Sequence, residues 1–221
     1  MSGAVLQAKG MLFDMDGVLV SSVASANRCW KQWAKHYGVE DWQQLVIPHG
    51  TRAEEIVHML APWVDVAEGL RRIEDMEIAD VTDIETLPGA RDLLESMSLE
   101  RWAIVTSATD RLLVARLRAA GLPQPERLIS ANMVSRGKPD PQPYLLGAQR
   151  LGVAAAECLV FEDAPSGVRA GVAAGARVVG VLGTTPAETL LADGAIWLVE
   201  SLASVQAVEQ GDGLRVTIQN A

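Results

Sequence analysis

The sequence predicts an α/β fold, in which a doubly wound, Rossmann-like parallel sheet carries an inserted all-helical subdomain. Two observations predict it. Short, continuous apolar runs recur along the chain and alternate with helical patterns, which is typical of a parallel sheet covered on both faces. The alternation breaks once, over residues 20–86, where only helical periodicity is found. The 221 residues suffice for one core of roughly 150 residues plus an insertion.

Six apolar runs are the predicted core strands. Each ends in small or polar residues, as buried strands do where the chain leaves the sheet. The runs are Gly10–Phe13, Trp102–Val105, Leu128–Ile129, Cys158–Phe161, Val178–Leu182 and Ile196–Val199.

The segments between the later runs have helical periodicity and helix stop signals. One helix is predicted over Arg111–Ala120 and another over Gln142–Leu151, because a glycine follows each. Near the end of the chain, a Gly-Asp-Gly sequence stands between two valine-containing segments. It predicts a terminal hairpin over Ala207–Ile218.

The interruption predicts a helical unit at residues 20–86, with the core formed by residues 1–19 and 87–221. Residues 20–86 contain twelve acidic and six basic residues, so they account for −6 of the formal net charge of −9. We expect most of these acidic side chains on a solvated helix face. Four of the six tryptophans also lie here, and we expect them to pack in a small separate core, because aromatic side chains dominate core energetics. They are Trp30, Trp33, Trp42 and Trp63.

Composition excludes several classes of protein. A net charge of −9 argues against nucleic-acid binding, which needs a basic footprint. No stretch approaches the roughly 18 apolar residues of a membrane span. The two cysteines, Cys29 and Cys158, are far apart, which favours neither a zinc site nor a disulfide framework. We therefore expect a cytoplasmic protein, and its charged surface favours a monomer.

Chemistry-bearing side chains follow the first, second and fourth apolar runs, where ligands bind in open α/β sheets. Carboxylates bind Mg²⁺, and an aspartate can attack phosphorus as a nucleophile. Hydroxyl and ammonium groups can offset charge on a phosphoryl group. Each residue alone also has an ordinary structural interpretation, such as a helix cap or a turn lysine, but together they predict phosphoryl chemistry. The residues are Asp14, Asp16, Thr106, Ser107, Lys138, Glu162 and Asp163.

Four ordered motifs carry a family resemblance: Asp14-Met15-Asp16-Gly17-Val18, Val105-Thr106-Ser107, Gly137-Lys138-Pro139 and Val160-Phe161-Glu162-Asp163-Ala164-Pro165-Ser166-Gly167. Over about residues 10 to 183, the sequence resembles the haloacid dehalogenase-like hydrolases. Within them it is similar to the small-molecule phosphatases and phosphomutases that carry a helical cap. The resemblance implies that residues 20–86 are this cap, which closes over the site and selects the substrate.

The resemblance implies a role for each catalytic residue. Asp14 is the nucleophile, and Asp16 is the general acid that protonates the leaving alcohol and then the base that activates water. Thr106 holds the phosphoryl group with Ser107 beside it, and Lys138 bridges nucleophile and phosphate. Beside a cation and Lys138, the pKa of Asp14 is expected to lie below its usual range.

The resemblance also implies an Mg²⁺ site. Asp14 supplies a side-chain oxygen and Asp16 its backbone carbonyl. Asp163 is the distal ligand, and Glu162 ligates directly or through water. Because a general acid must exchange its proton, the Asp16 carboxylate is expected to stay off the metal.

Within the predicted cap, His49-Gly50-Thr51-Arg52 resembles the cap loop of polyol-phosphate and deoxysugar-phosphate phosphatases. Arg52 is a candidate for a bidentate phosphate contact or for ordering the closed cap. His49 is a candidate for a hydrogen bond to a sugar hydroxyl. A surface arginine at a helix start and a structural histidine are the alternatives.

The sequence therefore predicts an Mg²⁺-dependent phosphatase that hydrolyses small phosphorylated sugars or polyols through an aspartyl-phosphate intermediate. A phosphomutase resembling β-phosphoglucomutase is the alternative, and Ala26 weakens it because that branch carries a histidine there. A non-catalytic protein that binds phosphorylated metabolites is a third possibility, which the complete set of catalytic residues argues against.

Overall fold

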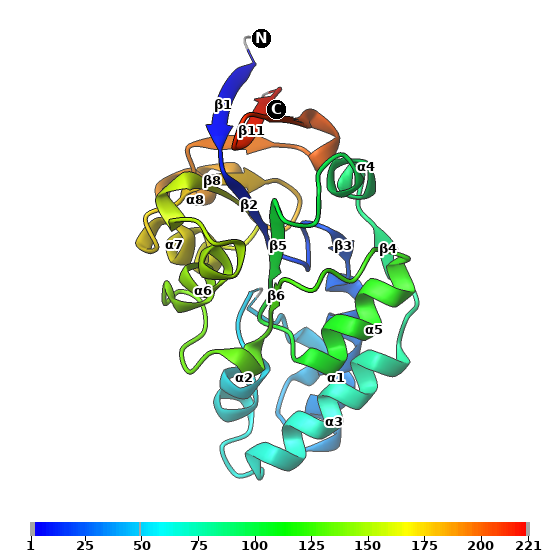
Figure 1. Ribbon diagram of the computed structural model, residues 1–221. Helices are drawn as coiled ribbons and strands as arrows, with labels where there is room; N and C mark the ends of the chain where they lie inside the picture. The colour runs from blue at the N-terminus through cyan, green and yellow to red at the C-terminus, as the bar shows by residue number, and fades with distance from the viewer. Residues whose placement is uncertain (1–2, 49, 220–221) are drawn as a thin grey trace.

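The computed structural model describes residues 3–48 and 50–219, and its centre is a six-stranded parallel sheet (Figure 1). Every predicted apolar run contributes a strand to it, so the predicted doubly wound fold is confirmed. In spatial order the strands are β6 (Leu128–Ile129), β5 (Trp102–Val105), β2 (Gly10–Phe13), β7 (Cys158–Glu162), β8 (Arg177–Val181) and β9 (Trp197–Val199).

Helices cover both faces of this sheet because successive side chains of each strand point to opposite sides. In β2, Met11 and Phe13 pack on the face covered by α4 (Ala90–Glu95) and α5 (Asp110–Ala120). Leu12, between them, packs on the opposite face. That face is covered by α6 (Gln142–Leu151), α7 (Pro165–Ala173) and α8 (Ala187–Ala192).

Three helices form the inserted unit at the lower end of Figure 1, namely α1 (Val23–His36), α2 (Ala53–Leu60) and α3 (Val66–Ala79). They enter and leave the core through a short antiparallel pair, β3 (Val20–Ser21) with β4 (Glu85–Thr86). The sequence interpretation missed these strands, because neither of them is an apolar run.

The inserted helices have a hydrophobic cluster of their own, as expected from their tryptophans. Trp30 and Trp33 are buried in it, and Trp42 packs against it. The indole of Trp33 donates a hydrogen bond to the Gly69 carbonyl over 2.9 Å. The expectation is wrong for Trp63, which is 64% exposed because it lies in the turn between α2 and α3.

A separate three-stranded antiparallel sheet joins the two ends of the described chain. It contains β1 (Ala4–Ala8), β11 (Gly213–Ile218) and β10 (Val205–Gln210), in this order. The terminal hairpin was predicted, but β1 was not, because its burial depends on pairing with a distant segment. Short 3₁₀ turns in the described chain lie at Trp42–Gln44, Ala131–Met133, Ala155–Glu157 and Leu202–Ser204.

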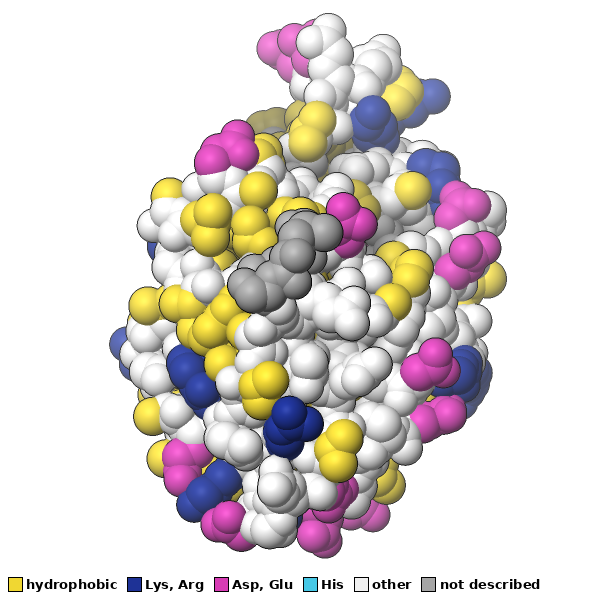
Figure 2. Space-filling model, turned by 90° about the horizontal axis from the view of Figure 1, so that it is seen from above, with side chains coloured by type: hydrophobic (Ala, Val, Ile, Leu, Met, Phe, Trp, Pro, Cys, Tyr) yellow, Lys and Arg dark blue, Asp and Glu magenta, His cyan; other side chains and the backbone are white. Residues whose placement is uncertain are grey.

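Two further features concern the charge of the surface and the length of the helices. Figure 2 shows the molecule from above, relative to Figure 1. On this face basic and acidic side chains are interspersed, and there is no continuous basic patch. None of the helices in the described part of the chain combines the length and hydropathy that a membrane crossing needs. Cys29 and Cys158 are both buried and free.

Candidate active site

The carboxyl ends of β5, β2 and β7 bring the predicted catalytic side chains together. These strands are neighbours with β2 in the middle, and Phe13 pairs with Ile104 on one side and Phe161 on the other. The residues that follow, Asp14 and Thr106, and Glu162 at the end of β7, therefore stand at the same edge of the sheet. Parallel strands produce this convergence because all of their carboxyl ends face one way.

A tight turn after β2 separates the two aspartates of the first motif. Gly17 has a φ of 85°, a conformation that glycine adopts without steric cost, and its N–H donates to the Val20 carbonyl over 2.9 Å. The turn directs the Asp16 carboxylate to different partners from those of Asp14. Asp16 accepts one hydrogen bond from Ser22 at 2.5 Å and one from Arg116 at 2.7 Å.

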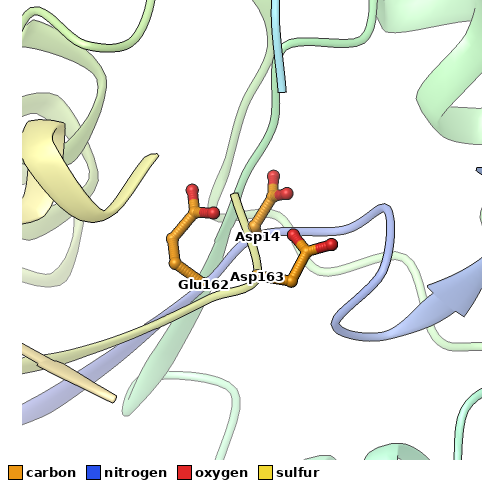
Figure 3. Close-up of side chains that lie close together, drawn as sticks. All are labelled: Asp14, Glu162 and Asp163. Carbon is orange, nitrogen blue, oxygen red and sulfur yellow. The ribbon is translucent and has the colours of Figure 1, made fainter. Parts of the chain in front are cut away.

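Three carboxylates gather beside the turn. Asp14, Glu162 and Asp163 each offer an oxygen, and these three oxygens lie within 4.8 Å of one another. Figure 3 shows the three side chains directed into a common space from the ends of β2 and β7. Several carboxylate oxygens at this spacing form a donor set that fits a hard divalent cation. Among the described residues, the Asp16 carboxylate is not part of this group of three.

Lys138 is buried and bonds to two of these carboxylates. Its ammonium group donates to Asp14 over 2.8 Å, to Glu162 over 2.6 Å and to the Val105 carbonyl over 2.9 Å. These bonds use all three hydrogens of the group. A hydrogen bond from Lys138 to a phosphate must therefore replace one of the three.

Without a cation, burial controls the protonation of Asp14. Burial raises the pKa of Asp14 to about 7; Lys138 opposes this shift, whereas Glu162 and Asp16 add to it. The expected lowering of this pKa concerns the protein with a cation bound and stays a prediction. For Lys138, burial favours the neutral amine, but Asp14 and Glu162 outweigh it and raise the pKa, so the lysine stays charged.

Two residues that sequence reasoning did not assign to the site fix the position of Glu162. Tyr144 in α6 donates a hydrogen bond from its hydroxyl to Glu162 over 2.5 Å. At Gly167, an added Cβ would lie 1.8 Å from the nearer carboxylate oxygen of Glu162. Gly167 belongs to the fourth motif and could have been recognised from the sequence. Tyr144 carries no such signal, because it lies within an ordinary helix.

We expect the substitution Gly167→Ala to displace Glu162 and to weaken cation binding. A methyl group at this position cannot coexist with the Glu162 carboxylate, so the carboxylate or α7 must move. Loss of one ordered carboxylate ligand should raise the apparent dissociation constant for Mg²⁺ about 10- to 100-fold. A thermal-shift titration with Mg²⁺ checks this result, with Val172→Ala, at an exposed position of the same helix, as the control. An unchanged affinity of Gly167→Ala for Mg²⁺ would contradict the close contact between Gly167 and the Glu162 carboxylate.

Asp14, Asp16 and the two hydroxyl residues line a cavity of about 390 Å³ between the core and the inserted helices. Asp14, Thr106 and Ser107 contribute from the core side. The Thr106 hydroxyl accepts a hydrogen bond from the Ala108 N–H over 3.0 Å, which leaves it able to donate its own hydrogen. The Ser107 hydroxyl donates to the Gly50 carbonyl over 2.9 Å, so it joins the core to the loop of the inserted unit.

Arg52 also lines this cavity and is mostly buried, with 18% of its side chain exposed. It donates to the Ala131 carbonyl over 3.3 Å, and an added Cβ on Gly137 would lie 2.2 Å from its Cδ. Arg52 therefore packs over the loop that precedes Lys138 and is not a surface arginine. His49, the other predicted residue of this loop, lies outside the described residues.

Proteins of known name are similar to this chain over most of its length. Hexitol phosphatase A of Escherichia coli (strain K12) is 40% identical, with 94% of this chain and 98% of that protein covered. 2-Deoxyglucose-6-phosphate phosphatase 2 of Saccharomyces cerevisiae is 30% identical, with coverage of 95% and 94%. Among solved structures, a hydrolase from Pseudomonas syringae superimposes with a TM-score of 0.78 at 26% identity, covering 88% of this chain and 94% of the other.

The sequence profile of the haloacid dehalogenase-like hydrolases matches residues 8–175. This span contains all four motifs and the whole of the inserted helical unit. A buried aspartate, a lysine and further carboxylates meet at the carboxyl edge of its parallel sheet. Together with the profile match and the two phosphatase relatives, this arrangement assigns the family: the chain belongs to the haloacid dehalogenase-like hydrolases.

Proposed function

We propose that the protein is an Mg²⁺-dependent phosphoric monoester hydrolase that acts on small phosphorylated sugars or polyols through an aspartyl phosphate. The observation that carries the proposal is the position of Asp14. Its side chain is buried and accepts a hydrogen bond from Lys138 at 2.8 Å. It lies next to two further carboxylates and forms part of the wall of a cavity of about 390 Å³. The nucleophile, the lysine ammonium group and the carboxylates that could bind a metal ion are therefore close together, beside a cavity that fits a small metabolite.

Hydrolases of this family generally use a divalent metal, and the donor set here suits Mg²⁺. The side chains of Asp14, Glu162 and Asp163 would hold it, with the backbone carbonyl of Asp16. When bound, the cation supplies positive charge that offsets the charge of the phosphate and of these carboxylates.

The reaction proceeds in two displacements on phosphorus. An oxygen of Asp14 forms a bond to phosphorus while the bond to the alcohol oxygen breaks, and Asp16 gives its proton to the departing alkoxide. Water then attacks the aspartyl phosphate; Asp16 takes a proton from it, and the bond between Asp14 and phosphorus breaks. Thr106, Ser107 and Lys138 orient the phosphoryl oxygens by donating hydrogen bonds.

We expect Mg²⁺ to stabilise the protein more at pH 8 than at pH 6. The pKa of Asp14 is raised to about 7 without a cation, so the metal-free protein loses stability as the pH rises through that value. Below it, a proton on Asp14 competes with the cation. At 100 times its dissociation constant, Mg²⁺ adds about 2.7 kcal/mol, or about 5–10 °C in Tm for a chain of this size.

Thermal unfolding with Mg²⁺ or EDTA at the two pH values measures this effect. Asp163→Asn should lose most of the Mg²⁺-dependent shift at pH 8, whereas the exposed control Asp212→Asn should keep it. An equal shift at both pH values would contradict the assignment of Asp14 as a ligand that must lose its proton.

Residues 20–86 are proposed to act as the cap that selects the substrate. Their side of the cavity combines apolar side chains, such as Trp30 and Leu70, with polar and charged ones, such as Asn27 and Glu74. Arg52 reaches across to the core and would contact the substrate or hold the cap closed. The relatives named as hexitol and 2-deoxyglucose-6-phosphate phosphatases support a sugar or polyol phosphate as the substrate class.

Hydrolysis is favoured over phosphoryl transfer between two positions of a sugar. The cavity wall carries the methyl group of Ala26 at the position where a mutase of this type would have a histidine. A hexose 1-phosphate distinguishes the two reactions, because a mutase returns an isomeric hexose phosphate and a phosphatase releases inorganic phosphate.

A phosphate-release panel of hexitol, hexose, pentose and glycerol phosphates, with Mg²⁺ or EDTA, tests the proposed function. We expect release from several of these esters only in the presence of the cation. Saturable binding without phosphate release across the panel would overturn it in favour of a non-catalytic binding protein. We also infer a cytoplasmic monomer that binds neither nucleic acid nor membranes, and light scattering tests its oligomeric state.

A further inference from the structure

A buried guanidinium links the predicted general acid to the inserted helices. Arg116 in α5 donates to Asp16 over 2.7 Å and to Glu77 of α3 over 3.1 Å. The exposed fractions of these three side chains are 8%, 16% and 6%, and all three residues line the cavity that contains Asp14. The four-motif resemblance did not point to Arg116 or Glu77, because neither lies in a motif.

The geometry fixes the orientation of the Asp16 carboxylate. Arg116 bonds to one of its oxygens and Ser22 bonds to the other, at 2.5 Å. Arg116 itself is held by two carboxylates through different nitrogen atoms, so it cannot rotate without breaking a bond to one of them. Burial favours a neutral guanidine, but Asp16 and Glu77 outweigh it and raise the pKa of Arg116, which stays charged.

The link depends on how α3 packs on α5. These helices lie side by side (Figure 1). Acidic residues of α3 bond to Thr109 and Arg111 at the start of α5. Glu74 accepts hydrogen bonds from Thr109 and Arg111, and Arg111 also bonds to Asp75 at 2.9 Å. Glu77 continues the same side of α3 one turn deeper, where it reaches Arg116 and not solvent.

We propose that Arg116 is a positioning residue that holds Asp16 in the orientation needed for proton transfer to the leaving alcohol. Glu77 holds Arg116 in turn, so the orientation of Asp16 is complete only when α3 is docked against α5. The inference rests on the proposed phosphatase function and adds to it a residue pair, outside the four motifs, that joins the cap to the acid step.

The leaving group provides the test, because an alkyl phosphate needs a proton on its departing oxygen and p-nitrophenyl phosphate does not. Single-turnover release of hexitol from a hexitol 6-phosphate and of nitrophenolate from the aryl ester isolates the step at which Asp14 is phosphorylated. For Arg116→Gln we expect the hexitol rate to fall about 100-fold or more, and the aryl rate to change less than about threefold. Arg116→Lys, which keeps the charge, should recover part of the hexitol rate.

Arg111→Gln is the matched control, because Arg111 also bonds to α3 from α5 but does not touch Asp16. It should leave the ratio of the two rates unchanged. If Arg116→Gln unfolds, Glu77→Gln replaces it, with a smaller loss that is again confined to the alkyl ester. Equal losses on both esters, or no loss on either, would overturn the positioning role. A wild-type protein that releases phosphate from neither ester would instead overturn the proposed function.

Discussion

Asp14→Asn is expected to abolish phosphate release while leaving the protein folded. The carboxylate oxygen is the atom that would form the bond to phosphorus, and an amide is not a nucleophile at that position. We expect kcat to fall by at least about four orders of magnitude, as with other essential nucleophiles. Phosphate release under saturating substrate and Mg²⁺ measures the effect.

The fold should tolerate this substitution. The pKa of Asp14 is raised to about 7, so a neutral side chain at this position does not conflict with its buried surroundings. Lys138 retains Glu162 as a partner at 2.6 Å. Asp212→Asn, which neutralises an aspartate with an 89% exposed side chain, is the control and should keep full activity. Turnover by Asp14→Asn within tenfold of the wild type would contradict the mechanism.

Lys138→Met should lower both activity and stability. The substitution leaves Asp14 and Glu162 buried without the ammonium group that bonds to both of them. Removing one partner of a buried ion pair costs about 3–5 kcal/mol in the free energy of unfolding. Because the carboxylates can escape the cost by binding protons, the loss should be greater at pH 8 than at pH 6. Urea unfolding in EDTA at both pH values measures it.

The double variant Lys138→Met/Glu162→Gln separates this electrostatic effect from packing. Neutralising Glu162 removes one of the two charges that Lys138 balances, so the double variant should be less destabilised than the sum of its single variants. Additive losses would show that the three groups do not act as a unit. Neither variant should recover phosphatase activity, because Lys138 also orients the phosphoryl group.

The fold could be predicted because its strands are continuous apolar runs, which occur in buried parallel sheets and in few other places. The site followed from the same runs, since Asp14, Thr106 and Glu162 stand at their ends and parallel strands bring their ends together. The place of each of these residues at the end of an apolar run was enough to predict that they lie together. Contacts between distant segments did not have to be known.

The remaining features depend on packing between segments that are distant in sequence. Arg116 and Glu77 are 39 residues apart and meet only because α3 lies against α5. Tyr144 reaches Glu162 from the middle of α6. The raised pKa of Asp14 follows from burial, which the composition of a motif does not reveal. In each case the missing information was a tertiary contact and not a residue type.

Most acidic side chains of the inserted unit are exposed, as expected from the sequence. The exception is Glu77, which is buried, while Glu74 and Asp75 bond to Arg111 of α5. These side chains are part of the contact between the inserted helices and the core. Of the three, Glu77 bonds to Arg116 and thereby acts on the position of Asp16.

The central claim is that Asp14 carries the phosphoryl group during turnover. Rapid acid quenching of the wild-type protein with Mg²⁺ and a hexitol phosphate, followed by peptide mass analysis, tests it directly. We predict the added mass of one phosphoryl group on the peptide that contains Asp14, lost on treatment with hydroxylamine and absent from Asp14→Asn. Phosphate release without this modification, or with the phosphoryl group on another residue, would contradict the account.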